Sequence, residues 1–461
     1  MTDLSTAPRP TVTPPLPWDF PVPQERQLPG GIRLLQHHLP GQHVLSVRVV
    51  IPLSLTDEPR DREGVASLMA RLLDEGAGRY SSDELAEVLE RHGIALGAGV
   101  AEGGLSVDLD VPSRFLPTAL ELLSLIVREP TFPEAEVRRM VKTRLAEIDQ
   151  ESASPPHLAM RHTIATLYAS HERASRPTGG GAGTVVQVTR DDVEGWFRER
   201  VGPSGATFIV AGDLGEHDVP GLVEAAFASW VVPTHVAPSP ARRPELARNA
   251  ARVVLVDRPG SVQSEIVVAC QGPDRSVAPG WAEYPVLAFI LGGSPNARID
   301  AVLREEKGYT YGIRAGFRPR PAGGVFITSG SVRAEVTAES VHILLGLLDG
   351  MRDGVRPTEV TAAVDFISRT APGRFATADA VADETSALAV ERLPLDFPTT
   401  NLRRVESLTP ELVDGAYGHV GAAGWTVIVV GDADTLRGPL IDLGVGPLSV
   451  VTSAGVGSAE D

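Results

Sequence analysis

The chain contains the same order of apolar and polar stretches twice. "RLLQHHLPGQHVLSVRVVI" (33–51) places apolar runs on both sides of a Pro-Gly pair, which is typical of two strands joined by a tight turn. "RVVLVDRPGSVQSEIVVAC" (252–270) has the same pattern, and Gly41 and Gly260 are 219 residues apart. Gly212 in "ATFIVAGD" and Gly431 in "WTVIVVGD" end two further apolar runs with the same spacing. A single offset at both ends of the repeat indicates two tandem copies of one domain.

Each copy combines strands with helices. Apolar residues at helical spacing predict helices over 63–76 and 81–93, and the second helix begins with a capping box of Ser81 and Glu84. "LSVDLDV" (105–111) alternates strictly, which is typical of a half-buried strand, and a long helical region follows over roughly 115–170. This order predicts an α+β fold of two tandem homologous domains, each a mainly antiparallel sheet with helices packed on one side.

The repeat and the local composition also predict the domain boundaries. We expect a proline-rich flexible tail over 1–24, a first domain over 25–235, a linker rich in Pro, Ala and Arg over 236–250, a second domain over 251–445 and a flexible tail over 446–461. Trp18 and Phe20 give the N-terminal tail an alternative to disorder, because they could lie against a partner.

Charge and composition exclude several classes of protein. A formal net charge of −17 without a basic stripe argues against nucleic acid as a partner. The start of the chain does not resemble a secretory signal, and no stretch is apolar enough for us to expect a membrane span, so we expect a cytoplasmic protein. The one cysteine, Cys270 in "EIVVAC", is expected to be a buried thiol.

"ILGGSPNARIDAVLREEKGYTYGI" (290–313) is the most specific stretch of the sequence. Together with the repeat, it resembles the pitrilysin/insulinase family of zinc metallopeptidases, in particular the short-chain, processing-peptidase-like branch. The resemblance implies that Arg304 and Tyr311 bind the substrate backbone near the scissile carbonyl. A guanidinium and a phenol suit this role, because both donate hydrogen bonds to an oxygen that gains negative charge. The alternative is an exposed helix arginine and a half-buried strand tyrosine.

The metal half of the family's site is missing from the first domain. The resemblance implies a His-x-x-Glu-His motif on the first domain's early helix, but the corresponding positions hold Ser67, Ala70 and Arg71. None of these side chains suits a zinc ion or a general base, so no zinc is expected in this chain. Glu147 matches the family's third ligand. We expect Arg71 to replace the charge of the metal and to pair with Glu147; the alternative places Glu147 on a solvated helix face.

A glycine-rich stretch and a histidine pair are two further candidates for a site. "TGGGAGT" (178–184) lacks the Gly-Lys-Ser/Thr of a phosphate-binding loop and is expected to be a mobile loop between helices. The resemblance also offers it a part in substrate handling, as in the non-catalytic subunit of mitochondrial processing peptidases. His157 and His162 are five residues apart, a spacing that does not place them on one helix face, so we interpret them as ordinary surface histidines.

These observations favour a chain that carries one half of an active site. The resemblance implies the non-zinc, substrate-binding subunit of a heterodimeric zinc metalloendopeptidase, inactive alone, in which a homologous partner supplies the zinc and His-x-x-Glu-His. The substrate would be an unfolded peptide or a leader segment. The alternative is a pseudopeptidase that acts as a scaffold or binds peptides. An independent zinc peptidase is disfavoured by Ser67, Ala70 and Arg71.

Overall fold

The computed structural model describes residues 17–230 and 236–452. Its first half forms one sheet with the strand order β1-β2-β8-β3-β7-β6, and only the pairing of β2 with β8 is parallel. The strands are β1 Gln24–Leu28, β2 Ile32–His38, β3 Val44–Pro52, β6 Ala95–Ala101, β7 Gly104–Pro112 and β8 Thr207–Gly212. A two-stranded ribbon, β4 Gly76–Ala77 and β5 Tyr80–Ser81, lies outside this sheet.

The second half repeats this topology. Its sheet has the order β11-β12-β10-β13-β9-β14, so β9, β13, β10, β12 and β11 take the places of β2, β8, β3, β7 and β6. The strands are β9 Val253–Asp257, β10 Gln263–Gly272, β11 Arg314–Pro319, β12 Gly324–Arg333, β13 Thr426–Gly431 and β14 Leu448–Thr452. β8 and β13 end at Gly212 and Gly431, the two glycines that revealed the repeat. The predicted duplication is therefore confirmed.

Helices cover the sheets. The first half contains α1 Val65–Arg71, α2 Ser82–Arg91, α3 Leu116–Arg128, α4 Glu134–Ala153, α5 Pro155–Leu167, α6 Ala182–Val185, α7 Arg190–Arg200 and α8 Val219–Phe227. The second half contains α9 Glu283–Ala288, α10 Arg298–Asp300, α11 Thr337–Asp349, α12 Pro357–Arg374, α13 Ala378–Glu391, α14 Phe397–Glu406, α15 Pro410–Tyr417 and α16 Ala433–Asp442. The capping box predicted for Ser81 and Glu84 is present at α2.

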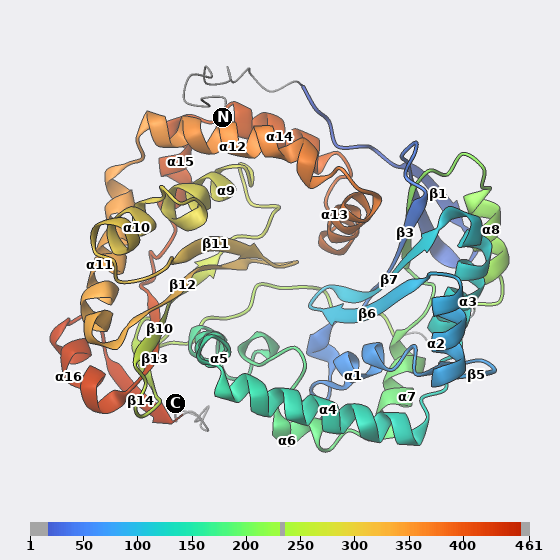
Figure 1. Ribbon diagram of the computed structural model, residues 1–461, viewed down its shortest axis with the longest axis horizontal. Helices are drawn as coiled ribbons and strands as arrows, with labels where there is room; N and C mark the ends of the chain where they lie inside the picture. Colours follow the sequence, from blue (N-terminus) through green and yellow to red (C-terminus); the bar gives the residue numbers. More distant parts are fainter. Residues whose placement is uncertain (1–16, 231–235, 453–461) are drawn as a thin grey trace, which may run out of the picture.

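Each half also lends one helix to the other half's sheet (Figure 1). α5 packs on β10 and β13, where Leu158 and Leu167 join an apolar cluster with Val267 and Ile428. α13 packs on β3 and β8 in the same way, with Ala382 against the first sheet. Each sheet therefore has helices on both faces, whereas the sequence pattern predicted helices on one face. Separating the halves would expose both of these apolar faces to water.

The two predicted tails are partly ordered. Within residues 17–24, Phe20 is buried, its amide donates to Thr399 Oγ1 at 2.9 Å, and Trp18 stacks on Phe375 with ring centroids 5.6 Å apart. The segment therefore crosses the second half before it enters β1 (Figure 1). At the other end, Leu448–Thr452 forms the edge strand β14. The prediction of flexible tails is wrong for these residues, because aromatic contacts hold the first segment and backbone pairing with β9 holds β14. Residues 1–16 and 453–461 lie outside the described part.

One expectation about apolar stretches also needs correction. The helical stretch Glu283–Glu306 is long and apolar enough to meet the length and composition criteria of a membrane span. Half of its most apolar window is buried inside the structure. Leu287, Leu291 and Leu303 are fully buried in the core of the second half. A core position accounts for the apolar character of this stretch.

Candidate functional site

The residues that the sequence predicts to be a degenerate zinc site lie on α1 and α4. On α1, Ala70 is buried, Ser67 is half-buried, and Arg71 ends the helix. Arg71 Nη1 donates to Glu147 Oε2 at 2.8 Å, and Nη2 donates to Oε1 at 2.6 Å. This two-pronged contact is the strongest geometry available to an arginine and a carboxylate. The pairing predicted from the sequence is confirmed, and the alternative of a freely solvated Glu147 is wrong.

A second arginine reinforces the pair. Arg144 Nη1 donates to Glu147 Oε2 at 3.2 Å and to Glu151 Oε1 at 2.6 Å. The hydrogen bond from Arg71, with further help from Arg144, lowers the pKa of Glu147 to about 2. Both carboxylate oxygens of Glu147 therefore accept hydrogen bonds from arginine side chains. A zinc site needs imidazole, thiolate or carboxylate donors facing a shared cation, so these residues do not fit zinc.

The glycine-rich stretch after α5 packs closely against the start of α1. Gly64 has φ +102°, and a Cβ atom there would lie 2.7 Å from the Gly179 carbonyl oxygen. A Cβ atom on Gly180 would lie 2.1 Å from the Glu63 carbonyl oxygen. The two backbones can approach this closely only because these positions lack side chains. The expectation of a mobile loop is wrong for this stretch, because backbone packing holds it in place.

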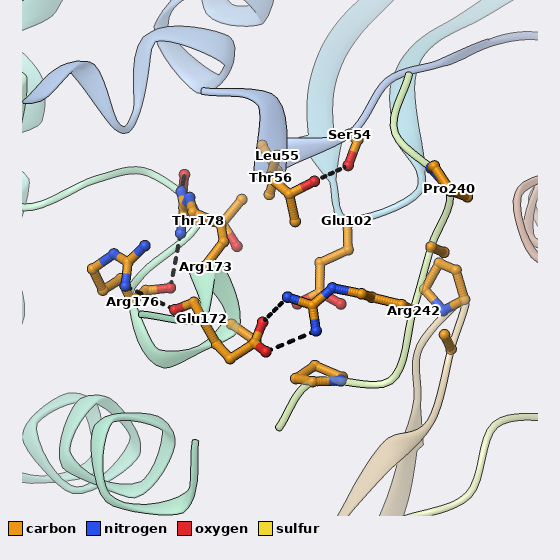
Figure 2. A pocket seen from close by; sticks show the side chains of 15 residues that line it. Ser54, Leu55, Thr56, Glu102, Glu172, Arg173, Arg176, Thr178, Pro240 and Arg242 are labelled. Carbon is orange, nitrogen blue, oxygen red and sulfur yellow. Dashed lines mark hydrogen bonds and ion pairs between the residues drawn. The ribbon is translucent and has the colours of Figure 1, made fainter. Parts of the chain in front are cut away.

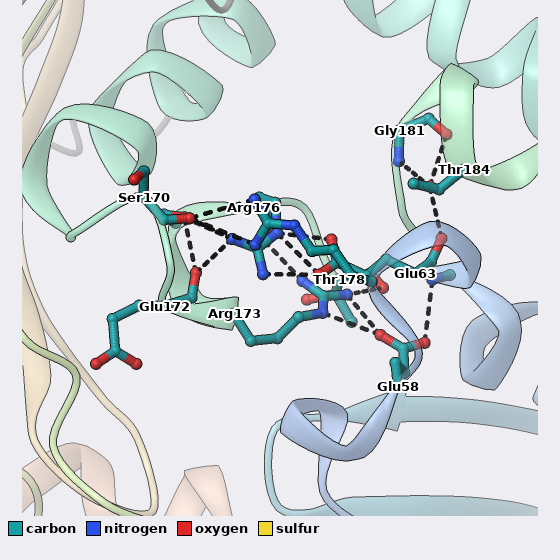
Figure 3. Close-up of polar contacts among 12 residues, drawn as sticks. Glu58, Glu63, Ser170, Glu172, Arg173, Arg176, Thr178, Gly181 and Thr184 are labelled. Carbon is teal, nitrogen blue, oxygen red and sulfur yellow. Dashed lines mark hydrogen bonds and ion pairs between the residues drawn. The ribbon is translucent and has the colours of Figure 1, made fainter. Parts of the chain in front are cut away.

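Two ion pairs, one of them buried, fix the same junction (Figure 3). Glu58 Oε2 accepts from Arg173 Nε and Nη2 at 3.0 and 2.9 Å, and the Glu58 side chain is fully buried. Glu58 Oε1 accepts from the amides of Gly64 and Ala66, and so caps α1. Burial raises the pKa of Glu58, although Arg173 opposes this effect.

Arg176 makes the second ion pair of this junction. Its guanidinium binds both oxygens of Glu63, with Nε 2.6 Å from Oε2. These pairs join segments more than 110 residues apart in the chain. The sequence carried no signal for them beyond the charged residues of each segment.

A small cavity of about 60 Å³ lies between the two halves (Figure 2). It is lined by the loop after β3, the stretch after α5, the linker and the turn between β11 and β12. Glu172 and Arg242 form a two-pronged ion pair across it, at 2.8 and 2.9 Å. Ligand atoms of His171, Glu172 and Glu245 lie within 4.8 Å of one another, the one such group in the described residues. A cation there would have to displace Arg242 from Glu172.

The predicted pair of substrate-binding residues lies in the second half. Arg304 is in a π-helical turn, Ala301–Glu306, that continues α10, and its side chain is 41% exposed. Tyr311 follows in the loop before β11 and is 96% exposed, more than any other large hydrophobic side chain in the described ranges. The alternative of a half-buried strand tyrosine is wrong.

The neighbours of Tyr311 are held in place. Tyr309 Oη donates to Glu339 at 2.7 Å, and Thr310 Oγ1 donates to the Ser331 carbonyl oxygen at 2.7 Å. The phenol of Tyr311 therefore projects into solvent from an anchored backbone. Arg304 and Tyr311 together offer a cation and neutral donors to an approaching acceptor.

Cys270 and His162 are both buried, although only the burial of Cys270 was expected from the sequence. Cys270 is buried, as expected, and burial raises its thiol pKa to about 12. His162 is buried on α5 instead of exposed, and burial lowers its pKa to about 4. The sequence did not reveal this, because the second sheet that covers α5 is formed by residues far away in the chain.

The fold is that of a duplicated α+β protein whose first half pairs Arg71 with Glu147. Residues 33–179 match the family model "Insulinase (Peptidase family M16)", and residues 187–366 match the model "Peptidase M16 inactive domain". The chain belongs to the insulinase (peptidase M16) family.

Known members of this family resemble the chain along most of its length. The "uncharacterized zinc protease Rv2782c" of Mycobacterium tuberculosis is 23% identical over 423 residues, covering 90% of this chain and 94% of that protein. The "non-peptidase homolog YmxG" of Helicobacter pylori is 20% identical over 381 residues, covering 82% and 86%. The crystal structure of a "peptidase M16 inactive domain" from Pseudomonas fluorescens has a TM-score of 0.80 at 23% identity, covering 89% and 98%. The inactive-domain match and the non-peptidase relative support an inactive member of the family.

Proposed function

We propose that this chain is the non-zinc, substrate-binding subunit of a heterodimeric zinc metalloendopeptidase. The proposal rests on the exposure of Tyr311. This side chain is 96% exposed on an anchored loop, seven residues after Arg304. An aromatic side chain held in solvent by a fixed backbone contributes nothing to the core of this chain. It is ready to contact a ligand or a second protein.

The chemistry of the pair defines what the partner must supply. A guanidinium and a phenol can bind a peptide carbonyl and favour the negative charge that develops on its oxygen. They do not generate a nucleophile from water. The α1 positions of this chain cannot do so either, because Arg71 engages Glu147. A homologous subunit with His-x-x-Glu-His and its zinc ion would provide the missing half.

The sheet next to Tyr311 suits an extended peptide. β11 is an edge strand of the second sheet, and it begins at Arg314, three residues after Tyr311. A peptide that paired with the free edge of β11 would pass beside the phenol while its backbone groups formed strand hydrogen bonds. This supports an unfolded peptide or a leader segment as the substrate.

A second candidate is a pseudopeptidase that acts as a scaffold or binds peptides. The pairing of Arg71 with Glu147 favours it, and one relative is named a non-peptidase homolog. A scaffold has no need for both Arg304 and Tyr311 in accessible positions, so we prefer the split active site.

A peptidase assay separates the two candidates. A quenched, unstructured peptide is incubated with this chain, with a homologous His-x-x-Glu-His chain from the same organism, and with their mixture. We expect zinc-dependent cleavage in the mixture alone. Full activity of the zinc-bearing chain by itself, unchanged when this chain is added, would contradict the proposal and favour the scaffold.

A further inference from the structure

Asp300 is a fully buried carboxylate next to the proposed substrate-binding pair. Its Oδ1 accepts from the Ile313 amide at 3.0 Å, and its Oδ2 accepts from Arg314 Nη1 at 2.6 Å. The side chain of Arg314 is 58% exposed, whereas that of Asp300 is 0% exposed. The carboxylate is therefore out of reach of a peptide, and its two partners both belong to the segment that follows Tyr311.

The position of Asp300 connects the two residues of the pair. Asp300 precedes Arg304 by four residues, about one helical turn, at the end of α10. Ile313, which Asp300 binds, follows Tyr311 by two residues. The hydrogen bond thus joins the helix that bears Arg304 to the end of the loop that bears Tyr311.

The start of the same loop is tied to the same helical turn. The Gly308 amide donates to the Arg304 carbonyl oxygen at 3.1 Å, and the Tyr309 amide donates to the Leu303 carbonyl oxygen at 2.8 Å. With the bond from Ile313 to Asp300, the loop is fastened at both ends to one short helical segment. Because both ends of the loop are bound to this helical segment, the hydrogen bonds restrict the distance between Arg304 and Tyr311.

We propose that Asp300 is a positioning residue that holds Tyr311 at a fixed distance from Arg304. The inference rests on the proposed function, since it assigns Asp300 a part in that reaction. The bond to the Ile313 amide does the positioning, and Arg314 neutralises the buried carboxylate. Displacing a reacting group by about 1 Å costs on the order of 10²-fold in rate, so loss of this anchor should be visible in catalysis.

The test has one measurement on the chain alone and one on the mixture with the zinc-bearing subunit. In the chain alone, hydrogen exchange of the Ile313 amide is compared between the wild type, Asp300→Ala and Asp300→Asn. We expect protection to fall at least about tenfold in Asp300→Ala and to persist in Asp300→Asn, whose amide oxygen still accepts from Ile313. An Ile313 amide in the wild type that exchanges as fast as an unprotected loop amide would overturn the inference, even if Asp300→Ala did not fold.

In the mixture, kcat/KM is measured for both variants, alone and combined with Tyr311→Phe. We expect Asp300→Ala to lose about 10- to 100-fold, Asp300→Asn to stay within about threefold of the wild type, and Asp300→Ala to add little once Tyr311→Phe is present. Glu87→Ala is the matched control, because Glu87 pairs with Arg91 on the surface of the first half. Losses from Asp300→Ala and Tyr311→Phe that multiply in full would show an effect independent of Tyr311 and overturn the inference.

The two measurements also separate this inference from the proposed function. A wild-type mixture without activity would refute the split active site whatever the exchange data show. An active mixture in which Asp300→Ala cleaves as fast as the wild type would refute the positioning role of Asp300 and leave the split active site standing.

Discussion

Replacing Arg71 by methionine removes the guanidinium that binds both carboxylate oxygens of Glu147. Glu147 then keeps only Arg144, whose Nη1 is 3.2 Å from Oε2. In the folded chain the pKa of Glu147 is about 2, compared with an ordinary value of 4.5. At about 1.4 kcal/mol per pKa unit, this difference of about 2.5 units sets an upper bound of roughly 3.5 kcal/mol on the stabilisation by all partners. The side chains of Arg71 and Glu147 are 33% and 35% exposed, so solvent screens the pair, and we expect Arg71→Met to cost about 1 to 1.5 kcal/mol.

The dependence on pH follows from the direction of the pKa change. Because folding lowers the pKa of Glu147, the pair stabilises the chain fully above pH 4.5, and this contribution disappears as the pH falls toward 2. The wild type and Arg71→Met should therefore differ at pH 7 and become similar near pH 2.5.

Urea unfolding, followed by circular dichroism at pH 7, 5 and 3, measures this difference. Arg91→Met is the matched control, because Arg91 pairs with Glu87 on the surface and both side chains are more than 60% exposed. We expect this control to cost less than about 0.5 kcal/mol. Equal stability of Arg71→Met and the wild type at pH 7, or a difference that stays unchanged at pH 3, would contradict a stabilising ion pair between Arg71 and Glu147.

Two further changes test the surroundings of α1. Arg173→Met should cost about 3 to 5 kcal/mol in urea unfolding, because it leaves the buried carboxylate of Glu58 without its cation; the double variant with Glu58→Gln should recover part of this loss, and a loss below about 1 kcal/mol would contradict the assignment of a buried pair. Ser67→His combined with Arg71→His should create zinc binding measurable by equilibrium dialysis, since the two histidines would stand one turn apart on α1 and Glu147 would be released from its two-pronged contact with Arg71. Zinc binding that survives an added Glu147→Gln change, or no binding at all, would contradict the correspondence of these positions with a former metal site.

The sequence was informative where a pattern is local or repeated. The duplication could be predicted because Gly212 and Gly431 end equivalent strands with one offset. The pairing of Arg71 with Glu147 could be predicted because the family resemblance places both at one site, and a lone carboxylate there needs a cation. Arg304 is exposed on its helical turn, and its role in binding substrate is still a prediction.

The sequence was silent where contacts join distant segments. The apolar faces of α5 and α13 have ordinary helical spacing, and nothing in that spacing shows which sheet they cover. Glu58 and Arg173 are 115 residues apart, and each lies among other charged residues, so neither was recognisable as buried. The burial of Phe20 follows from an aromatic contact with Phe375, which a proline-rich composition does not reveal.

In the proposed split active site, this chain supplies Arg304 and Tyr311, and the zinc lies in another subunit. The most direct measurement is kcat/KM for cleavage of an unstructured peptide by the mixture of the two chains, with this chain as the wild type, as Tyr311→Phe or as Arg304→Ala. We expect each substitution to lower kcat/KM by about 10²-fold or more while the two chains still associate, because each removes a donor to the developing negative charge. Cleavage that is unchanged by both substitutions would contradict the split active site and leave this chain as a scaffold.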